Sequence, residues 1–221
     1  MQDQAIDIKA RIWKTDSAQA RADALACAAA VVRAGGVVVY PTETLYGLGG
    51  DPMSEAVIER IYRIKGRDFK KPLPLIASDR ETVRKVTAQW SPAAEQLARA
   101  FWPGPLTLIL PATSLVPPRL HGYTGKVAIR VSSHPIAHKL SAGVGGLLIS
   151  TSANLGGQPS YTDSKEIAPE FLSRVDGLID AGKLPGDLPS TIVDLSADSP
   201  RLVRAGCVAW ESIRRILAFT T

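Results

Sequence analysis

Short apolar runs of three to five residues, set between turn-forming and helix-forming segments, constrain the fold of this chain most strongly. They are too short for buried helices, but they have the length and β-branched content of strands. Helical periodicity separates the earlier runs, which favours an α/β or α+β chain. The runs are Val37–Tyr40, Leu73–Ala77, Leu106–Leu110, Val127–Val131, Leu147–Thr151, Leu178–Asp180, Thr191–Leu195 and Arg201–Arg204.

Capping residues and apolar periodicity predict the helices between these strands. The first helix covers 16–34, with Asp16 or Ser17 as its N-cap and Gly35-Gly36 at its end. The remaining signals are a periodic segment over 54–65 followed by Gly66, a capping box at 78–81, Ser91-Pro92, and a last helix over 210–219.

The chain shows no linker, internal repeat or low-complexity segment, which favours one domain. Its 221 residues are enough to bury a core without disulfides or metals. We therefore expect an α/β (α+β) fold on one large, twisted mixed sheet flanked by helices. Residues 1–15 are expected to form an N-terminal extension, and residues 16–221 the domain.

The formal net charge of +5 is unevenly distributed. Residues 60–85 hold nine basic and three acidic side chains, so this stretch carries +6 and the remainder −1. Such an excess indicates either an anionic partner, nucleotide or nucleic acid, or a solvated helix face. The nine cations are Arg60, Arg63, Lys65, Arg67, Lys70, Lys71, Arg80, Arg84 and Lys85.

Cysteine and histidine usage argues against several kinds of site. Cys27 and Cys207 are too isolated for a disulfide framework or a zinc centre, and a reducing cytoplasm fits best. The three histidines leave little for a metal centre, so no protein-bound metal is expected. No apolar run reaches the roughly 18 residues of a membrane span, and residues 1–14 lack the apolar core of a signal peptide.

Three polar segments follow strands or helices, although the common nucleotide and hydrolase motifs are absent. Residues 40–48 place hydroxyls at the end of a strand, where α/β proteins bind ligands, or form an ordinary turn. Residues 65–73 place four cations beside a glycine, in a pattern that matches a polyphosphate. Residues 150–160 combine hydroxyls, an asparagine and glycines, which can bind an anion or form a plain polar loop.

Seven segments occur in an order that resembles one known family. They are PTETLYGLGGD, KGR with KPLPLIA, FWPGPLTLIL, VAIRVSSHP, STSANLGGQPS, PSTIVDLS and RLVRAG. Together they cover about residues 20–208. The chain thereby resembles the YrdC-like family, specifically the TsaC-type L-threonylcarbamoyladenylate synthases in their short, single-domain form.

The resemblance implies an enzyme that makes threonylcarbamoyl-AMP and pyrophosphate from L-threonine, bicarbonate and ATP. The product feeds modification of tRNA position 37 through a separate tRNA threonylcarbamoyltransferase complex. ATP is then a substrate accompanied by Mg²⁺, and no tightly bound organic cofactor is expected. Positioning and charge neutralisation would supply the rate, because both reactants are anionic and no protein nucleophile is needed.

The resemblance also assigns individual residues by motif position. Thr44 contacts L-threonine, Arg130 pairs with its carboxylate, and Ser190 or Thr191 closes the same pocket. Glu43 is either an outer residue near the metal or a structural one. The implied ATP ligands are Lys65, Arg67, Lys71, Lys126, Ser152, Asn154, Ser160 and Arg204, of which Lys65, Arg67, Ser152 and Asn154 form the catalytic set.

Two positions depart from the family pattern. Asp68 stands where proline usually follows K-G-R, and it either weakens nucleotide binding or points to solvent. Ile76 stands where many members show histidine, which removes one substrate contact.

Two other functions compete with the synthase. A non-catalytic module for double-stranded RNA or tRNA would need only the cations, and Arg60, Arg63, Arg80, Arg84 and Lys85 are its candidate contacts. Trp90, Trp102 and Trp210 favour packing over base stacking. A carbamoyl-adenylate domain of hydrogenase-maturation carbamoyltransferases would bring zinc-finger and acylphosphatase-like parts, which this sequence lacks.

Overall fold

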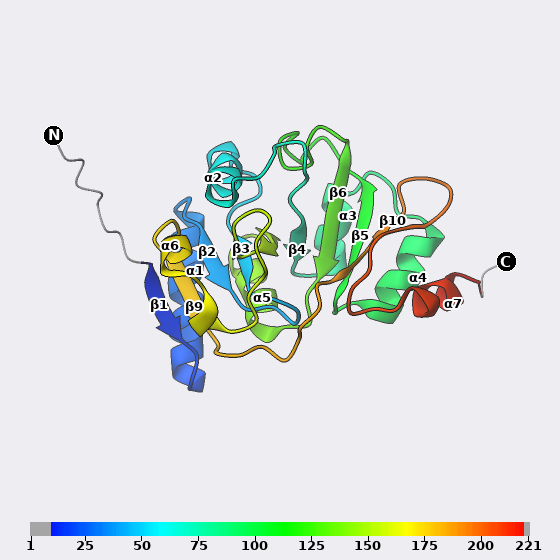
Figure 1. Cartoon of the computed structure of the whole chain (residues 1–221). Coiled ribbons are helices and arrows are strands. Elements are labelled where there is room, and N and C mark those ends of the chain that lie inside the picture. The colour runs from blue at the N-terminus through cyan, green and yellow to red at the C-terminus, as the bar shows by residue number, and fades with distance from the viewer. Residues whose placement is uncertain (1–9, 219–221) are drawn as a thin grey trace.

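The computed structural model describes residues 10–218 and contains two mixed β-sheets. The predicted α/β architecture is confirmed, but the prediction of one large sheet is wrong. Figure 1 shows β1, β9, β2 and β3 on one side of the molecule and β4, β6, β5 and β10 on the other. The strands are β1 Arg11–Lys14, β2 Val38–Tyr40, β3 Gly47–Gly49, β4 Leu75–Ala77, β5 Leu106–Pro111, β6 Lys126–Val131, β7 Leu147–Ile149, β8 Thr151–Ser152, β9 Gly177–Asp180, β10 Thr191–Asp194 and β11 Arg201–Arg204.

The two sheets are joined where the predicted strand over 147–151 divides. β7 pairs with β4 in the six-stranded sheet, whose order is β11-β10-β5-β6-β4-β7. One residue later, β8 pairs with β3 in the five-stranded sheet, whose order is β1-β9-β2-β3-β8. Ser150 lies at the crossover, and its N–H donates to Pro74 O at 2.8 Å. An uninterrupted apolar run cannot reveal this change of partner, because both halves have strand character.

Seven α-helices and one 3₁₀ segment lie within residues 10–218. α1 packs against α5, β1 and β9, whereas α4 packs against α7 on the other side of the molecule (Figure 1). The helices are α1 Ala18–Arg33, α2 Glu55–Lys65, α3 Arg80–Val86, α4 Pro92–Phe101, α5 Pro135–Gly143, α6 Pro169–Leu172 and α7 Trp210–Ala218, with the 3₁₀ segment η1 at Ser164–Glu166.

The N-caps of α1 and α4 agree with the sequence prediction, and that of α3 differs from it. Ser17 caps α1 by accepting the N–H of Ala20 at 3.0 Å, and Ser91 caps α4 with Pro92 first in the helix. The predicted capping box at 78–81 is wrong, because Asp79 is the cap of α3 and accepts the N–H of Thr82 at 2.6 Å.

Part of the predicted N-terminal extension forms a strand. Arg11–Lys14 fall within the predicted N-terminal extension, and they form β1, which runs parallel to β9. Residues 1–9 of that extension and the predicted helix end at Phe219 lie outside the described residues.

Two apolar clusters fill the molecule. The smaller one lies between α1, α5 and the neighbouring strands, and it includes Ala28, Val38, Tyr40, Ile76 and Leu140. The larger one joins α2, α3, α4 and both sheets. Thr107 and Ile109 of β5 and Ala128 and Arg130 of β6 alternate along their strands, so they lie on one face of the six-stranded sheet, which is left to line a cleft.

Candidate active site

A cleft of about 500 Å³ opens where the two sheets approach each other. The six-stranded sheet supplies residues from β5, β6, β10 and β11, and the opposite side is formed by the loop after β2 and by β8. The polar lining residues are Thr42, Thr44, Tyr46, Arg67, Thr107, Arg130, Ser150, Thr151, Ser152, Ser160, Asp187, Ser190 and Arg204.

Three arginines line this cleft, and the Nε of each donates a hydrogen bond to the protein. Arg67 donates from Nε and Nη2 to Lys71 O and Pro72 O at 3.3 and 3.0 Å. Arg204 donates from Nε and Nη2 to Ser190 O at 3.1 and 2.8 Å. Arg130 donates from Nε to Glu43 Oε1 at 3.1 Å. Within residues 10–218, the Nη1 group of each guanidinium has no hydrogen-bond partner, so it is available to a ligand.

The three guanidinium groups are mutually unfavourable without a ligand. Burial lowers the pKa of Arg204, and the charges of Arg130 and Arg67 lower it further. Burial also lowers the pKa of Arg67. Like charges brought together in a partly desolvated cleft favour binding of an anion that neutralises them.

Glu43 lies behind Arg130 rather than in the cleft. Its carboxylate accepts from Arg130 Nε and, through a short hydrogen bond, from the Ser132 hydroxyl. Burial opposes ionisation of Glu43, but the Arg130 charge and these hydrogen bonds outweigh it and hold its pKa below the usual range. Glu43 is therefore an ionised anchor that fixes the orientation of Arg130, whose side chain is only 5% exposed.

Thr42 and Thr44 form a hydroxyl pair beside Arg130. Thr42 Oγ1 lies 2.7 Å from Leu45 O, an oxygen that can only accept, so the Thr42 proton is directed there. The 3.0 Å contact between the two hydroxyls must therefore be donated by Thr44. The Thr44 oxygen is left as an acceptor on the wall of the cleft, suited to an N–H or O–H group of a ligand.

Lys65 is buried under the loop that follows β8. Its ammonium donates to Ser152 O, Asn154 O and Asn154 Oδ1 at 2.5, 2.8 and 3.2 Å. Burial lowers the pKa of Lys65 to about 7, with Arg67 adding to the effect. Because all three contacts are oxygens, Lys65 ties the C-terminal end of α2 to residues 152–154 and sets where Ser152 faces the cleft.

Ser190 occupies the opposite rim, at the start of β10. Its hydroxyl lies 2.9 Å from Thr107 Oγ1 and accepts from Arg204 Nη2 at 3.0 Å. One residue further, the Thr191 hydroxyl turns away and donates to Val208 O at 2.7 Å. The hydroxyl of PSTIVD that lines the cleft is therefore that of Ser190.

Comparison with known proteins places this cleft in a family. Residues 30–206 match the Sua5/YciO/YrdC model, described as "Telomere recombination". The chain belongs to the Sua5/YciO/YrdC family. The threonylcarbamoyl-AMP synthase of Pyrococcus abyssi is 36% identical over 190 residues, which cover 86% of this chain and 56% of that protein. That of Nitrosococcus oceani is 40% identical over 169 residues, 76% of this chain and 90% of that protein.

A solved structure of a Sua5 protein is also similar to this chain. The crystal structure of P. abyssi Sua5 complexed with L-threonine aligns with a TM-score of 0.87 at 33% identity, covering 94% of this chain and 60% of that chain. This member of the Sua5/YciO/YrdC family thus spans about three fifths of the length of its Pyrococcus relative.

The cleft brings together seven of the residues predicted from the family motifs: Thr44, Arg67, Arg130, Ser152, Ser160, Ser190 and Arg204. Five predicted ligands do not line it. Lys65 and Asn154 lie beneath the loop after β8, Lys71 is exposed and Thr191 faces Val208. Lys126 pairs with Asp194 at 3.4 Å.

The two departures from the family pattern lie outside the cleft lining. Asp68 is exposed and accepts the N–H of Lys70 at 2.9 Å, so it caps the turn after α2. Ile76 is fully buried in the apolar cluster beside α1 and α5. Their positions give neither residue a contact with a ligand in the cleft.

Residues that the motifs did not single out also line the cleft, chiefly Thr107, Ser150 and Asp187. Ser150 opens the quoted STSAN segment, and Asp187 stands three residues before Ser190. Both residues could have been found from the sequence as polar residues close to a motif residue. Thr107 carried the same signal, because it is the one hydroxyl residue of the quoted segment FWPGPLTLIL.

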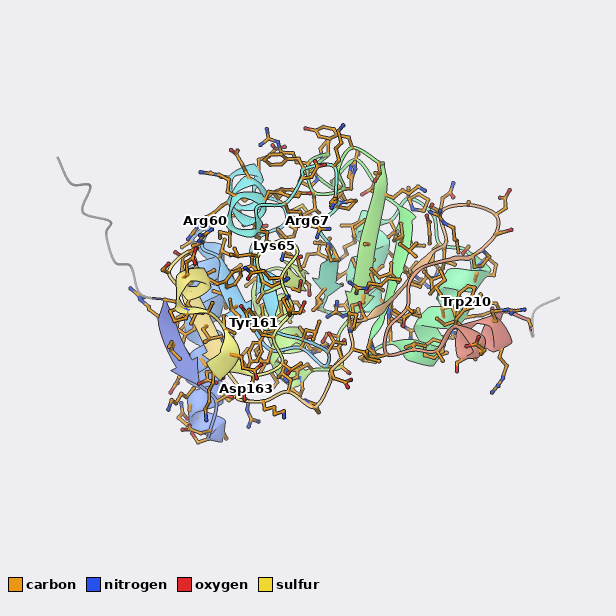
Figure 2. All side chains as sticks on the ribbon, viewed as in Figure 1. Arg60, Lys65, Arg67, Tyr161, Asp163 and Trp210 are labelled. Atoms are coloured by element: carbon orange, nitrogen blue, oxygen red, sulfur yellow. The ribbon has the colours of Figure 1, made fainter. Side chains whose placement is uncertain are left out.

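Most of the basic surplus in residues 60–85 is paired with acids. Arg60 binds Asp176 through two contacts of 2.6 and 2.9 Å, and Arg84 binds Glu95 at 2.9 Å. Figure 2 shows Arg60 on the side of Lys65 and Arg67 that faces α6, with Trp210 at the far side of the molecule near α4 and α7. Further pairs join Arg63 to Glu59, Arg80 to Glu95 and Lys85 to Glu81.

Among residues 10–218, no three or more His, Cys, Asp and Glu side chains are grouped so that they could hold a metal ion. No helix in that same range is long and apolar enough to cross a membrane.

Proposed function

We propose that this protein is an L-threonylcarbamoyladenylate synthase, which makes threonylcarbamoyl-AMP and pyrophosphate from L-threonine, bicarbonate and ATP. The observation that carries the proposal is the convergence of Arg67, Arg130 and Arg204 on one cleft, each with an Nη1 group that has no hydrogen-bond partner among residues 10–218. The names of the relatives support it, since those of Pyrococcus and Nitrosococcus are threonylcarbamoyl-AMP synthases.

The Arg130 side of the cleft suits the amino acid. Arg130 is buried and fixed by Glu43, so its free Nη1 can meet a carboxylate in a set direction. Thr44 presents an acceptor beside it, and Ser190 presents a hydroxyl on the opposite rim. A small amino acid with a carboxylate, an amine and a hydroxyl matches this set of partners.

The Arg67 side of the cleft suits the nucleotide. Arg67 and Ser152 stand on segments that Lys65 clamps together, and Ser160 and Arg204 lie on the same cleft. Two guanidinium groups and the Ser160 hydroxyl give a polyphosphate both charge neutralisation and hydrogen-bond donors, whereas the Ser152 hydroxyl donates to Asn154 Oδ1. In this proposal Lys65 and Asn154 act on ATP by holding this loop, and Lys71 and Lys126 can reach the phosphates only from outside the cleft.

The chemistry then requires little from the protein beyond placement. The free amine of threonine forms a bond to the carbon of bicarbonate and a water molecule leaves, which gives an N-carboxylate. If carbon dioxide forms first, bicarbonate loses hydroxide and the amine then loses a proton, so the net change is the same. A carbamate oxygen attacks the α-phosphorus of ATP, and the bond to the leaving pyrophosphate breaks. The arginines neutralise the approach of two anions and the charge that develops on pyrophosphate.

Magnesium fits this cleft as a companion of ATP. The one carboxylate that lines the cleft within the described residues is Asp187, too few to build a protein-held site. Mg²⁺ keeps several waters and binds phosphate oxygens in such enzymes, so its charge would offset the triphosphate. No tightly bound organic cofactor enters the proposed reaction.

The proposed product is an activated intermediate for tRNA position 37, received by a tRNA threonylcarbamoyltransferase complex. Direct tRNA or double-stranded RNA contact is the alternative role, and the ion pairs of Arg60, Arg80 and Arg84 count against it. The free thiols of Cys27 and Cys207 accord with the reducing cytoplasm as the proposed location.

The proposal is tested by following the product itself. Purified protein is incubated with ATP, Mg²⁺, L-threonine and isotopically labelled bicarbonate, and the mixture is separated and analysed by mass spectrometry. The label is expected in a species with the mass of threonylcarbamoyl-AMP. Label absent from any adenylate, with substrates recovered intact, would reject the synthase.

A further inference from the structure

Asp187 is the one acidic residue among those lining the cleft within the described part of the chain. No described residue forms an ion pair or a hydrogen bond with its carboxylate. The cleft that it lines also contains Arg67, Arg130 and Arg204, each held by other groups. An acid left unpaired in a cationic cleft is available to a positively charged group of a ligand.

The backbone places Asp187 on the amino-acid side of the cleft. A Cβ added to the preceding residue, Gly186, would lie 2.6 Å from Glu43 O and 3.1 Å from Thr44 Cα. Glycine is therefore required there, because the loop packs directly on the backbone of residues 43–44. The loop that carries Asp187 thus lies against the segment whose Thr44 hydroxyl offers an acceptor.

A second contact fixes the other end of this loop. Cys207 donates its N–H to Pro189 O at 3.0 Å, and its Sγ lies 3.1 Å from Leu188 O. The carboxylates of Glu43 and Asp187 both raise the pKa of the Cys207 thiol, after burial as the largest cause. The loop that carries Asp187 is consequently anchored at two points, and the exposed Asp187 side chain lines the cleft with its carboxylate near enough to Cys207 to act on the thiol, as Glu43 does.

From this placement we propose that Asp187 recognises the amino group of the amino-acid substrate, together with the Thr44 oxygen. This inference rests on the proposed function and names a specificity residue that the motif positions do not include. In this proposal Arg130 pairs with the substrate carboxylate, and Asp187 pairs with the substrate amino group. Two opposite charges in a fixed arrangement select an α-amino acid over a simple hydroxy acid.

The same carboxylate also separates the two substrates. A triphosphate drawn by three arginines could otherwise occupy the amino-acid side of the cleft. Repulsion between Asp187 and a phosphate disfavours that arrangement, while the ammonium of the correct substrate relieves it. The carboxylate therefore contributes both an attraction and a rejection.

The test compares ligands that differ in the amino group. Binding of L-threonine, of 3-hydroxybutanoate and of Mg²⁺-ATP is measured by calorimetry for the wild type, Asp187→Asn and Asp198→Asn. Asp198 is an exposed aspartate on the loop between β10 and β11, outside the cleft lining, and serves as the matched control.

Asp187→Asn is expected to weaken L-threonine binding by roughly 10-fold or more, the size of a charged hydrogen bond. Its binding of 3-hydroxybutanoate and Mg²⁺-ATP should be at least as strong as that of the wild type, because a negative charge that repels anions has been removed. Retained binding of these two ligands also shows that the variant is folded. Asp198→Asn should bind all three ligands normally.

Three results would overturn the inference. If Asp187→Asn binds L-threonine as well as the wild type does, Asp187 does not contact the substrate. If binding of 3-hydroxybutanoate is weakened equally, Asp187 does not recognise the amino group. A loss confined to Mg²⁺-ATP would make Asp187 a magnesium ligand. Failure of the wild type to bind L-threonine is a separate result, because it rejects the proposed function itself.

Discussion

Glu43 and Arg130 form a buried ion pair, 3.1 Å between Oε1 and Nε, behind the wall of the cleft. The pair joins the loop after β2 to β6, so it couples the two sheets at the point where the cleft opens. Ser132 completes the arrangement by donating to the other carboxylate oxygen. The position of the substrate-facing arginine therefore depends on an acid that does not itself line the cleft.

Glu43→Gln is expected to affect the use of L-threonine before that of ATP. The amide removes the charge that holds Arg130, so the KM for L-threonine should rise by roughly 10-fold, the size of one charged hydrogen bond, with the KM for ATP near the wild-type value. Steady-state kinetics with each substrate varied in turn measure this split. A parallel rise in both KM values would mean that Glu43 supports the whole cleft.

The same pair should make stability depend on pH. Because the pKa of Glu43 is lowered in the folded protein, its stabilisation is present above the unfolded value of about 4.3 and is lost as pH falls through the folded value. Urea unfolding should show Glu43→Gln to be less stable by about 3–5 kcal/mol at pH 7. The free energies of unfolding of the two proteins should converge in acid. A difference that stays constant with pH would show that ionisation of Glu43 does not contribute to stability.

Arg67→Ala and Arg130→Ala are expected to separate the two halves of the cleft. Arg67 stands on the phosphate side, so its loss should raise the KM for ATP, and loss of Arg130 should raise that for L-threonine, each by roughly 10- to 100-fold. Equal effects of both variants on both substrates would mean that the two halves are assigned wrongly.

The sequence predicts the local elements well and their partners less well. The run over 147–151 has strand character throughout, yet its two halves belong to different sheets, because a polar crossover at Ser150 is invisible to periodicity. β3 was missed because Gly47–Gly49 lacks the β-branched residues that mark a strand. Thr44 and Arg130 could be found from their motifs, whereas Asp187 depends on a loop packing that only the fold defines.

Lys65→Met is expected to reduce stability as well as activity. The three oxygens around its ammonium would lose their donor, at a cost of about 1–3 kcal/mol. Thermal unfolding measures this, with the exposed Lys71→Met as the control that should change little. If Lys65 served only to contact ATP, the free Lys65→Met protein would be as stable as the wild type.

The pKa of Lys65 predicts a pH dependence of the loop after β8. Below about pH 7 the ammonium is present and clamps residues 152–154, and above it the neutral amine loses this hold. The KM for ATP should therefore rise with pH through about 7 in the wild type but not in Lys65→Met. If the KM of the wild type for ATP stays constant between about pH 6 and about pH 9, the Lys65 ammonium does not titrate in this range.

The paired cations predict little involvement of RNA in the reaction. Arg84 bonds to Glu95 and lies over the Trp90 ring at 5.3 Å, so it is not free to bind phosphate. Arg84→Ala should leave adenylate formation unchanged and should hardly alter RNA binding or its salt dependence. A marked loss of RNA affinity, with a shallower salt slope, would favour the RNA-binding role.

The central claim, that the cleft joins L-threonine, bicarbonate and ATP, is tested most directly by pyrophosphate release. Purified protein is given ATP, Mg²⁺ and bicarbonate, with and without L-threonine, and pyrophosphate is measured over time. Release that needs both L-threonine and bicarbonate is the predicted result. Release that is absent, or that proceeds equally without L-threonine, would contradict the claim.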